Sequence, residues 1–285
     1  MENDALRELA AAAAAADGQP PFSDQSLVDV ATGARRLLTV DSVGAALITV
    51  DADPAEAELV IHPDARRQGH GQRLLSEVLA SVPGTLLVWA HGDHPGARVL
   101  AERNGFQAVR TLLQLRAPVP EPEPTPPVPN APASVGRAVG SERPFRPGVD
   151  DAAWLELNAA AFADHPEQGK LTQPDLDARM AEAWFDPADF LLLWDGEQLA
   201  AFCWLKVVDD LGEFYVVGVD PARQGQGLGH RLVQAGLDRL AARGIRTAAL
   251  YVDADNEPAV NLYRRYGFTN HTIDVQYRRE GAHNL

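Results

Sequence analysis

The sequence repeats one order of motifs in its two halves, and this repeat limits the folds that the chain can adopt. A glycine-rich stretch follows a short apolar run in each half, and Gly69 matches Gly227 at an offset of 158 residues. A Gly-Phe pair lies further on in each half, and Gly105 matches Gly267 at an offset of 162 residues. Two copies of a pattern this long indicate two duplicated domains rather than a solenoid of short repeats.

A proline-rich segment, residues 117–134, separates the two copies. Eight of its eighteen residues are proline, which excludes a helix or an interior strand and is typical of an extended spacer. The length of 285 residues suits two domains. We therefore expect an N-terminal domain over residues 1–116, a linker over residues 117–134 and a C-terminal domain over residues 135–285.

Each copy reads as a strand, a glycine-rich turn, an amphipathic helix, a second strand, a second helix and a last strand. In the second half, Asn256 is a suitable N-cap for the second helix, and Gly267 ends it. Upstream we expect helices near residues 151–162 and 174–184, then a hairpin turning at Asp195-Gly196. The order predicts an α/β fold in which a mixed, mostly antiparallel sheet is flanked by helices.

Composition narrows the possible partners. The net charge of −15 argues against nucleic acid, whose phosphates an acidic surface repels. Cys203 is the single cysteine, so no intrachain disulfide forms, as in cytoplasmic proteins. No apolar stretch reaches the roughly 18 residues of a membrane span, and we expect the alanine-rich N-terminus to be a helix and not a signal peptide. The histidines show no metal-binding spacing, so we expect no metal.

The loop Gln224–Gly229 follows a strand and opens a helix. Its glycines allow close backbone approach, and free amides at a helix N-terminus suit a pyrophosphate; the alternative is a plain glycine-rich turn. A Walker loop needs Lys-Ser or Lys-Thr next, whereas His230-Arg231 and, in the first half, Gln72-Arg73 follow. The glycines at 225, 227 and 229 also depart from the G-x-G-x-x-G pattern of dinucleotide-binding loops.

This loop and its partner, Arg66–Gly71, resemble the coenzyme A loop of the GCN5-related N-acetyltransferase superfamily. The asparagine-led helix with a tyrosine, Asn256 to Tyr263, followed by Gly267-Phe268, is also similar to that superfamily. The resemblance covers both halves and implies two tandem domains with acetyl-CoA as cosubstrate. It also implies that the strand before each loop splays from its neighbour and pairs with the pantetheine arm.

The resemblance implies coenzyme contacts in both halves. In the second half they are Val217, Gly218, Val219, Gln224, Gly225, Gln226, Gly227, Leu228, Gly229, His230, Asn256, Glu257, Pro258, Ala259, Val260 and Asn261. In the first half they are Leu59, Val60, Ile61, Arg66, Arg67, Gln68, Gly69, His70, Gly71 and Gln72.

Three second-half stretches, residues 161–169, 212–221 and 250–256, are similar to tandem enzymes of this superfamily that acetylate the cysteinyl amine of cysteinyl-glucosaminyl-inositol. The resemblance implies acceptor contacts at the following residues: Asp24, Glu167, Lys206, Glu213 and Tyr251. Lys206 and Glu167 also suit solvated loop charges. The acceptor is a small molecule, and we expect a monomer. Two other interpretations remain open: a different amine acceptor, such as a protein N-terminus or an aminoglycoside, or a non-catalytic acyl-CoA sensor.

Acetyl transfer needs a base for the ammonium and an acid for the departing thiolate. The resemblance implies Glu213 as the base and Tyr263 as the acid. Glu213 lies among apolar residues; the alternative is an exposed carboxylate at a strand end. Tyr263 follows Asn256 by seven residues, which places both on one helix face; the alternatives are a packing aromatic there, or Tyr266 as the acid.

The first half lacks these groups, so we expect it to be catalytically silent. At the offset of 162, Tyr263 aligns with Ala101. At the offset of 158, Glu213 aligns with Ala55, and Glu56 and Glu58 are shifted by odd numbers, which turns a strand side chain to the other face.

Overall fold

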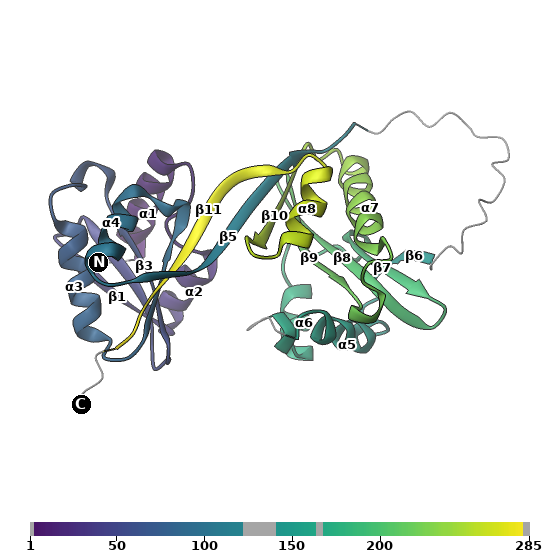
Figure 1. The fold of residues 1–285 in the computed structure, drawn as a ribbon, viewed down its shortest axis with the longest axis horizontal. Coiled ribbons are helices and arrows are strands. Elements are labelled where there is room, and N and C mark those ends of the chain that lie inside the picture. The colour runs from purple at the N-terminus through teal and green to yellow at the C-terminus, as the bar shows by residue number, and fades with distance from the viewer. Residues whose placement is uncertain (1–2, 122–140, 164–167, 282–285) are drawn as a thin grey trace. The chain divides into compact units, whose positions relative to one another are not determined.

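The computed structural model describes residues 3–121, 141–163 and 168–281, and the chain forms two compact units (Figure 1). Unit 1 comprises Met1–Gln114, Asp253–Asp255 and Asn270–Leu285; unit 2 comprises Leu115–Val252 and Asn256–Thr269. The C-terminal strand thus belongs to unit 1, whereas the sequence-based boundary placed everything from residue 135 in the second domain. The expected linker start at residue 117 is wrong, because strand β5 (Gln107–Pro118) continues to Pro118 and lies between two other strands. Residues 122–134 of the expected linker lie outside the described residues.

Unit 1 contains these elements in chain order: α1 (Asn3–Asp17), α2 (Asp24–Thr32), β1 (Arg35–Val40), β2 (Gly44–Thr49), β3 (Ala55–Ile61), α3 (His70–Ser81), β4 (Leu86–Ala90), α4 (Pro95–Arg103) and most of β5 (Gln107–Pro118), then β11 (Thr269–Arg279). The strand order is β1-β2-β3-β4-β11-β5. The β3–β4 pair is parallel, and the β1–β2, β2–β3 and β4–β11 pairs are antiparallel. The expected alanine-rich helix at the N-terminus is confirmed as α1.

Alternate residues of a strand point to opposite sides of the sheet, and the unit 1 strands carry apolar side chains on both sides. Helices therefore cover both faces. On one face, the buried side chains Leu74, Leu75 and Val78 of α3 pack on strand residues that include Ile48. On the other face, Leu6 and Leu9 of α1 pack on Leu47 and its neighbours.

Unit 2 contains these elements: β6 (Ser141–Pro144), α5 (Asp151–Ala161), α6 (Gln173–Met180), β7 (Phe190–Asp195), β8 (Gln198–Val208), β9 (Leu211–Val219), α7 (Leu228–Ala242), β10 (Thr247–Asp253) and α8 (Glu257–Arg265). The strand order is β10-β9-β8-β7-β6, with β9–β10 parallel and the other pairs antiparallel. The expected hairpin is confirmed as β7 and β8. The second upstream helix, α6, ends at Met180, short of the predicted residue 184.

The two faces of the unit 2 sheet carry different side chains. Gly236 of α7 lies so close to the sheet that an added Cβ would be 2.4 Å from the Phe214 ring and 3.3 Å from Cys203 Sγ. The opposite face bears an aromatic core in which Trp154 of α5 packs on Phe202 and Trp204 of β8.

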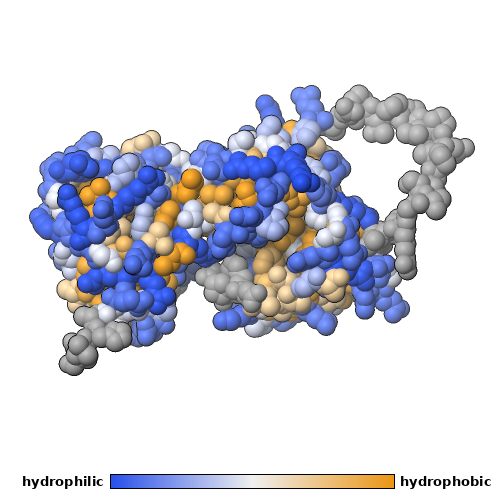
Figure 2. Space-filling view, viewed as in Figure 1, coloured by the Kyte–Doolittle hydropathy of each residue, from blue (hydrophilic) through white to orange (hydrophobic). Residues whose placement is uncertain are grey.

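The surface mixes hydrophilic and apolar side chains, as in most folded proteins. Figure 2 shows hydrophilic side chains over much of each unit, with apolar side chains exposed between them. No helix in the described part of the chain is long and apolar enough to cross a membrane.

Candidate active site

Strand β9 separates from its parallel neighbour along its second half. The β9–β10 register runs from Leu211 opposite Thr247 to Phe214 opposite Leu250, although β9 continues to Val219. On its other side β9 stays paired with β8 as far as Val219. The backbone of Val217–Val219 therefore faces β10 across a widening gap, and an extended ligand can pair there as a strand would. This is the splay that the sequence resemblance implied.

The loop after β9 prepares the N-terminus of α7 for an anion. Gly225 and Gly227 have φ of 75° and 81°, the left-handed region that glycine adopts without strain. Gly227 caps α7 and has no side chain with which to accept a hydrogen bond from the first-turn amides, unlike a serine or asparagine cap. Gly229 matters for packing instead, because an added Cβ would be 3.0 Å from Leu262 Cδ2. Glycine at this position therefore lets α7 and α8 pack closely.

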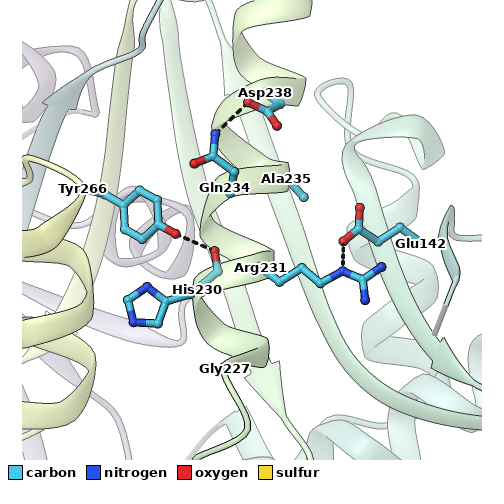
Figure 3. A pocket seen from close by; sticks show the side chains of 8 residues that line it. All are labelled: Glu142, Gly227, His230, Arg231, Gln234, Ala235, Asp238 and Tyr266. Atoms are coloured by element: carbon cyan, nitrogen blue, oxygen red, sulfur yellow. Dashed lines mark hydrogen bonds and ion pairs between the residues drawn. The ribbon is translucent and has the colours of Figure 1, made fainter. Parts of the chain in front are cut away.

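A surface pocket of about 490 Å³ opens beside this loop (Figure 3). Gly227, His230, Arg231 and Tyr266 are among its lining residues. The Tyr266 hydroxyl donates a hydrogen bond to the His230 carbonyl at 2.8 Å, and Arg231 Nε pairs with Glu142 at 2.7 Å. Tyr266, the sequence-level competitor of Tyr263, thus has its proton engaged by the backbone of the loop helix.

Tyr263 belongs to α8, and its side chain is buried. Asn256 caps this helix, its Oδ1 accepting from the Ala259 amide at 3.2 Å. Tyr263 is 8% exposed and meets the Phe268 ring edge-on. Burial, and to a lesser extent the neighbouring Cys203, raises the pKa of Tyr263 above its usual value. The phenol is therefore protonated at neutral pH, as a proton donor must be.

Three of the five expected acceptor residues lie on neighbouring strands near the start of β9. Lys206 of β8 lies directly opposite Glu213 in the antiparallel ladder. Ala249 of β10 lies opposite Glu213 on the other side, and Tyr251, two residues further, is 46% exposed. Side chains two apart share a face, so the sheet brings Glu213, Lys206 and Tyr251 to one region. Asp24 begins α2 of unit 1, and Glu167 lies outside the described residues.

A bulge in β9 separates Glu213 from the splayed segment. Trp204 lies opposite Val216, but the next residue, Leu205, lies opposite Phe214, which leaves Tyr215 as an extra residue. In unit 1 the β2–β3 register is continuous from Gly44–Ile61 to Ile48–Ala57. The bulge therefore distinguishes the second unit from the first.

Glu56 is the counterpart of Glu213 in unit 1. Glu56 lies opposite Leu87 and Glu213 lies opposite Ala249, and these two partners differ by 162 residues, the Gly-Phe offset. The predicted alignment of Glu213 with Ala55 is therefore wrong, because the bulge adds one residue to β9. Sequence spacing alone carries no signal of such a bulge.

Unit 1 repeats the splay and the loop. The β3–β4 register ends at Glu58 opposite Trp89, while β3 continues through Leu59, Val60 and Ile61. Arg67 and Gly69 have φ of 63° and 88°, matching Gly225 and Gly227, and Gly69 caps α3.

Arg66, expected to favour a coenzyme phosphate, is already paired with a carboxylate. Its two terminal nitrogens bind the two carboxylate oxygens of Asp17, each at 2.7 Å, and His94 Nε2 is 3.0 Å from Asp17 Oδ1. The hydrogen bonds from Arg66 hold the pKa of Asp17 below its usual value. Arg66 and His94 correspond to Gln224 and Asn256 of unit 2, so these positions differ in chemistry between the units.

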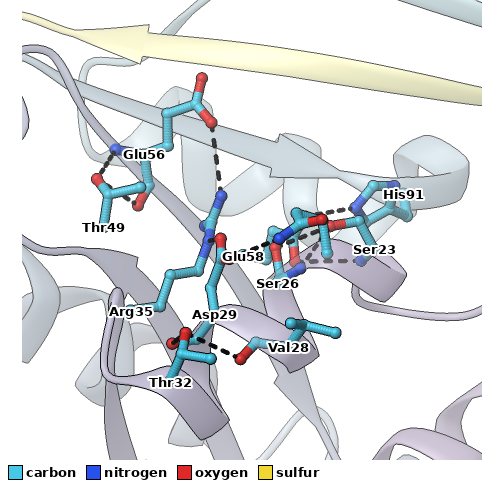
Figure 4. A network of polar contacts seen from close by, with 11 residues as sticks. Ser23, Ser26, Val28, Asp29, Thr32, Arg35, Thr49, Glu56, Glu58 and His91 are labelled. Atoms are coloured by element: carbon cyan, nitrogen blue, oxygen red, sulfur yellow. Dashed lines mark hydrogen bonds and ion pairs between the residues drawn. The ribbon is translucent and has the colours of Figure 1, made fainter. Parts of the chain in front are cut away.

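Sequence analysis missed a buried polar cluster in unit 1. The His91 ring lies between Glu58 Oε1 at 3.3 Å and Asp274 Oδ2 at 3.2 Å, and the Ser23 amide donates to Glu58; Figure 4 shows the Ser23–Glu58–His91 part. Burial opposes the charged ring, but the hydrogen bonds and charges of Asp274 and Glu58 outweigh it and raise the pKa of His91 to about 9. Asp274 lies on β11, more than 180 residues away in sequence.

Comparisons with known proteins place the chain in a family. The model of the acetyltransferase (GNAT) family matches residues 153–268, and that of an acetyltransferase (GNAT) domain matches residues 34–108. Mycothiol acetyltransferase of Streptomyces coelicolor is 47% identical over 98% of this chain and 92% of the relative. The protein of the same name from Clavibacter sepedonicus is 48% identical over 95% of this chain and 90% of its own length.

Two solved structures share the fold. A GCN5-related N-acetyltransferase from Sphaerobacter thermophilus matches with a TM-score of 0.70 and 24% identity over 97% of this chain and 91% of that chain. A tandem GNAT protein from the clavulanic acid biosynthesis pathway matches with a TM-score of 0.66 and 18% identity over 99% and 96%. The chain therefore belongs to the GNAT acetyltransferases and, among these, to the mycothiol acetyltransferase family. The predicted fold class, two tandem domains of this superfamily, is confirmed.

Proposed function

We propose that the chain transfers the acetyl group of acetyl-CoA to the cysteinyl amine of cysteinyl-glucosaminyl-inositol, giving mycothiol and CoA. One observation carries the assignment to unit 2: a single strand, β9, holds Glu213 at its start and the splayed segment Val217–Val219 at its end, directly before the glycine loop. The acceptor is supported by the name of relatives that are 47% identical over 98% of this chain.

Backbone groups hold the coenzyme in this proposal. The amides at the start of α7 bind the pyrophosphate, and Val217–Val219 pairs with the pantetheine arm as an added strand. Both contacts depend on main-chain geometry that the structure supports, namely the left-handed Gly225 and Gly227 and the gap between β9 and β10. The thioester then lies along β9, toward Glu213.

Side chains move the protons. Glu213 accepts a proton from the acceptor ammonium, directly or through water, and the freed amine attacks the thioester carbonyl carbon. A C–N bond forms and the C–S bond breaks. Tyr263 donates its phenolic proton to the departing sulfur, and its phenolate takes up the second proton that the amine nitrogen loses as the amide forms; Glu213 returns its proton to solvent. Lys206 and Tyr251, near Glu213 in the sheet, bind the polyhydroxylated part of the acceptor, with Asp24 and Glu167 as further contacts.

Unit 1 binds acetyl-CoA in this proposal without turning it over. Its splayed segment and its loop repeat the backbone geometry of unit 2. Ala101 stands at the Tyr263 position and has no proton to give. Glu56 stands at the Glu213 position, but Arg35 Nη2 lies 3.6 Å from its carboxylate.

The test measures CoA release by the purified full-length chain with acetyl-CoA and one amine at a time. We expect the highest kcat/KM with cysteinyl-glucosaminyl-inositol, and far lower values with an N-terminal peptide or an aminoglycoside. Glu213→Gln serves as the control, because it should keep acetyl-CoA binding and lose turnover. A preference for the peptide or the aminoglycoside would refute the proposed acceptor, and no CoA release with any amine would favour a non-catalytic sensor.

We further propose that the enzyme acts as a monomer in the cytoplasm.

A further inference from the structure

The ammonium of Lys206 lies over aromatic rings although a carboxylate residue faces it. Lys206 and Glu213 are directly opposite in the β8–β9 ladder, where oppositely charged side chains ordinarily pair. Lys206 Nζ instead lies 5.5 Å from the centre of the Trp184 ring and 6.0 Å from that of Tyr215. Among the described residues, Lys206 has no ion-pair partner within 4 Å. The rings therefore determine where this charge sits.

The two rings are held in place from several sides. Trp184, which follows α6, packs at ring-centre distances of 5.2 Å from Tyr215 and 5.8 Å from the buried Trp204. The Tyr215 hydroxyl accepts a hydrogen bond from Arg179 Nε of α6 at 3.2 Å. Tyr215 is the extra residue of the β9 bulge, so the bulge itself brings this ring beside Lys206. The result is a fixed aromatic wall next to the Glu213 position.

We propose that Trp184 is a positioning residue whose indole face holds the Lys206 ammonium beside Glu213 but not paired with it. Glu213 then stays able to accept the proton of the acceptor ammonium, and Lys206 stays able to donate to acceptor hydroxyls. This inference rests on the proposed function, because it gives Glu213 and Lys206 the roles assigned there. Without the ring, the four-carbon stem of lysine lets the ammonium reach the carboxylate, and an opposite charge at that distance favours the ionised form of Glu213.

The test compares Trp184→Leu, which removes the ring, with Trp184→Phe, which keeps one. The first readout is the pH titration of the Glu213 side-chain carboxyl carbon by NMR, assigned with Glu213→Gln. In Trp184→Leu we expect the midpoint to fall by about one pH unit, as for a carboxylate that gains an opposite charge. In Trp184→Phe it should stay close to that of the wild type. In Trp184→Leu/Lys206→Met it should return to the wild-type value.

The second readout is kinetic. Trp184→Leu should lower kcat/KM for the acceptor by about tenfold, the change in base strength that one pH unit represents, while the Kd for acetyl-CoA is unchanged. Two results would overturn the inference. One is a Glu213 titration midpoint that is unaltered in a folded Trp184→Leu variant, and the other is an equal midpoint in Trp184→Leu and Trp184→Leu/Lys206→Met. If Trp184→Leu does not fold, Trp184→Met, which also removes the ring, is compared with Trp184→Met/Lys206→Met in the same way. Wild-type protein that fails to acetylate the acceptor would refute the proposed function, while the NMR titration still tests the wall.

Discussion

Valine at position 227 tests whether the loop before α7 binds acetyl-CoA. Gly227 has φ of 81°, and an added Cβ would meet no atom within 4 Å, so the folded chain has room for the side chain. The cost to folding is the left-handed backbone, about 1–2 kcal/mol, which is small beside the usual 5–15 kcal/mol of stability. We expect the valine methyls to obstruct the approach of a phosphate to the first-turn amides of α7. Loss of two charge-assisted hydrogen bonds, about 1.5 kcal/mol each, weakens binding about 100-fold.

The matched control is Gly69→Val, because Gly69 has φ of 88° and equally open space in unit 1. Both variants should lose a similar amount in thermal melting temperature. Titration calorimetry with acetyl-CoA and a CoA-release assay then separate the units: Gly227→Val should lower kcat/KM for acetyl-CoA by about 100-fold, and Gly69→Val should leave most of it. Unchanged acetyl-CoA affinity in Gly227→Val would refute the loop assignment. Loss of turnover in a folded Gly69→Val variant, as complete as in Gly227→Val, would make unit 1 a working active site.

Three further predictions address single side chains. Glu213→Gln should slow turnover most at neutral pH and less at high pH, where the acceptor amine is deprotonated without help; a pH-independent defect in a rate profile would contradict a role as base. Tyr263→Phe should lower kcat while the Kd for acetyl-CoA stays the same, and unaltered turnover would reduce Tyr263 to a packing residue. Because the pKa of His91 is raised to about 9 from 6.5, its charge stabilises the fold fully below about pH 6.5 and loses this effect as pH rises through 9. The difference in free energy of unfolding between the wild type and His91→Gln should therefore be largest at pH 6 and should shrink toward pH 10. A constant difference across this range would refute the conclusion that a charged His91 stabilises the fold.

Local sequence predicted the loops and their helices because each depends on residues that are close in the chain. The glycines around residue 227 need positive φ, and Asn256 caps the helix that begins at the next residue. Both follow from the chemistry of one or two residues. The duplication was equally visible, because it repeats these local signals at a fixed offset.

Features that depend on partners distant in sequence were not predictable in the same way. The bulge at Tyr215 is visible only in the β8–β9 register. Because it adds one residue to β9, Glu213 aligns with Glu56 and not with Ala55. The resemblance implied Arg66 as a coenzyme contact, but its guanidinium is paired with Asp17, 49 residues earlier in the chain. The placement of β11 in unit 1 likewise depends on its pairing with β4.

The proposed difference between the two units suggests how a duplicated acetyltransferase domain can lose its chemistry and keep its shape. The proposed coenzyme contacts come mainly from backbone: a strand that leaves its neighbour and a glycine-capped helix start. Unit 1 has both features, and each unit also has a glycine two residues after the cap, where an added Cβ would lie 3.2 Å from Leu100 or 3.0 Å from Leu262. Proton transfer instead depends on single side chains that the fold does not need. If Tyr263 is the acid, as we propose, alanine at the corresponding position 101 of α4 leaves the departing thiolate of unit 1 without a proton donor. A frame that holds coenzyme therefore tolerates loss of the reaction in one copy, provided that Glu213 and Tyr263 remain together in the other.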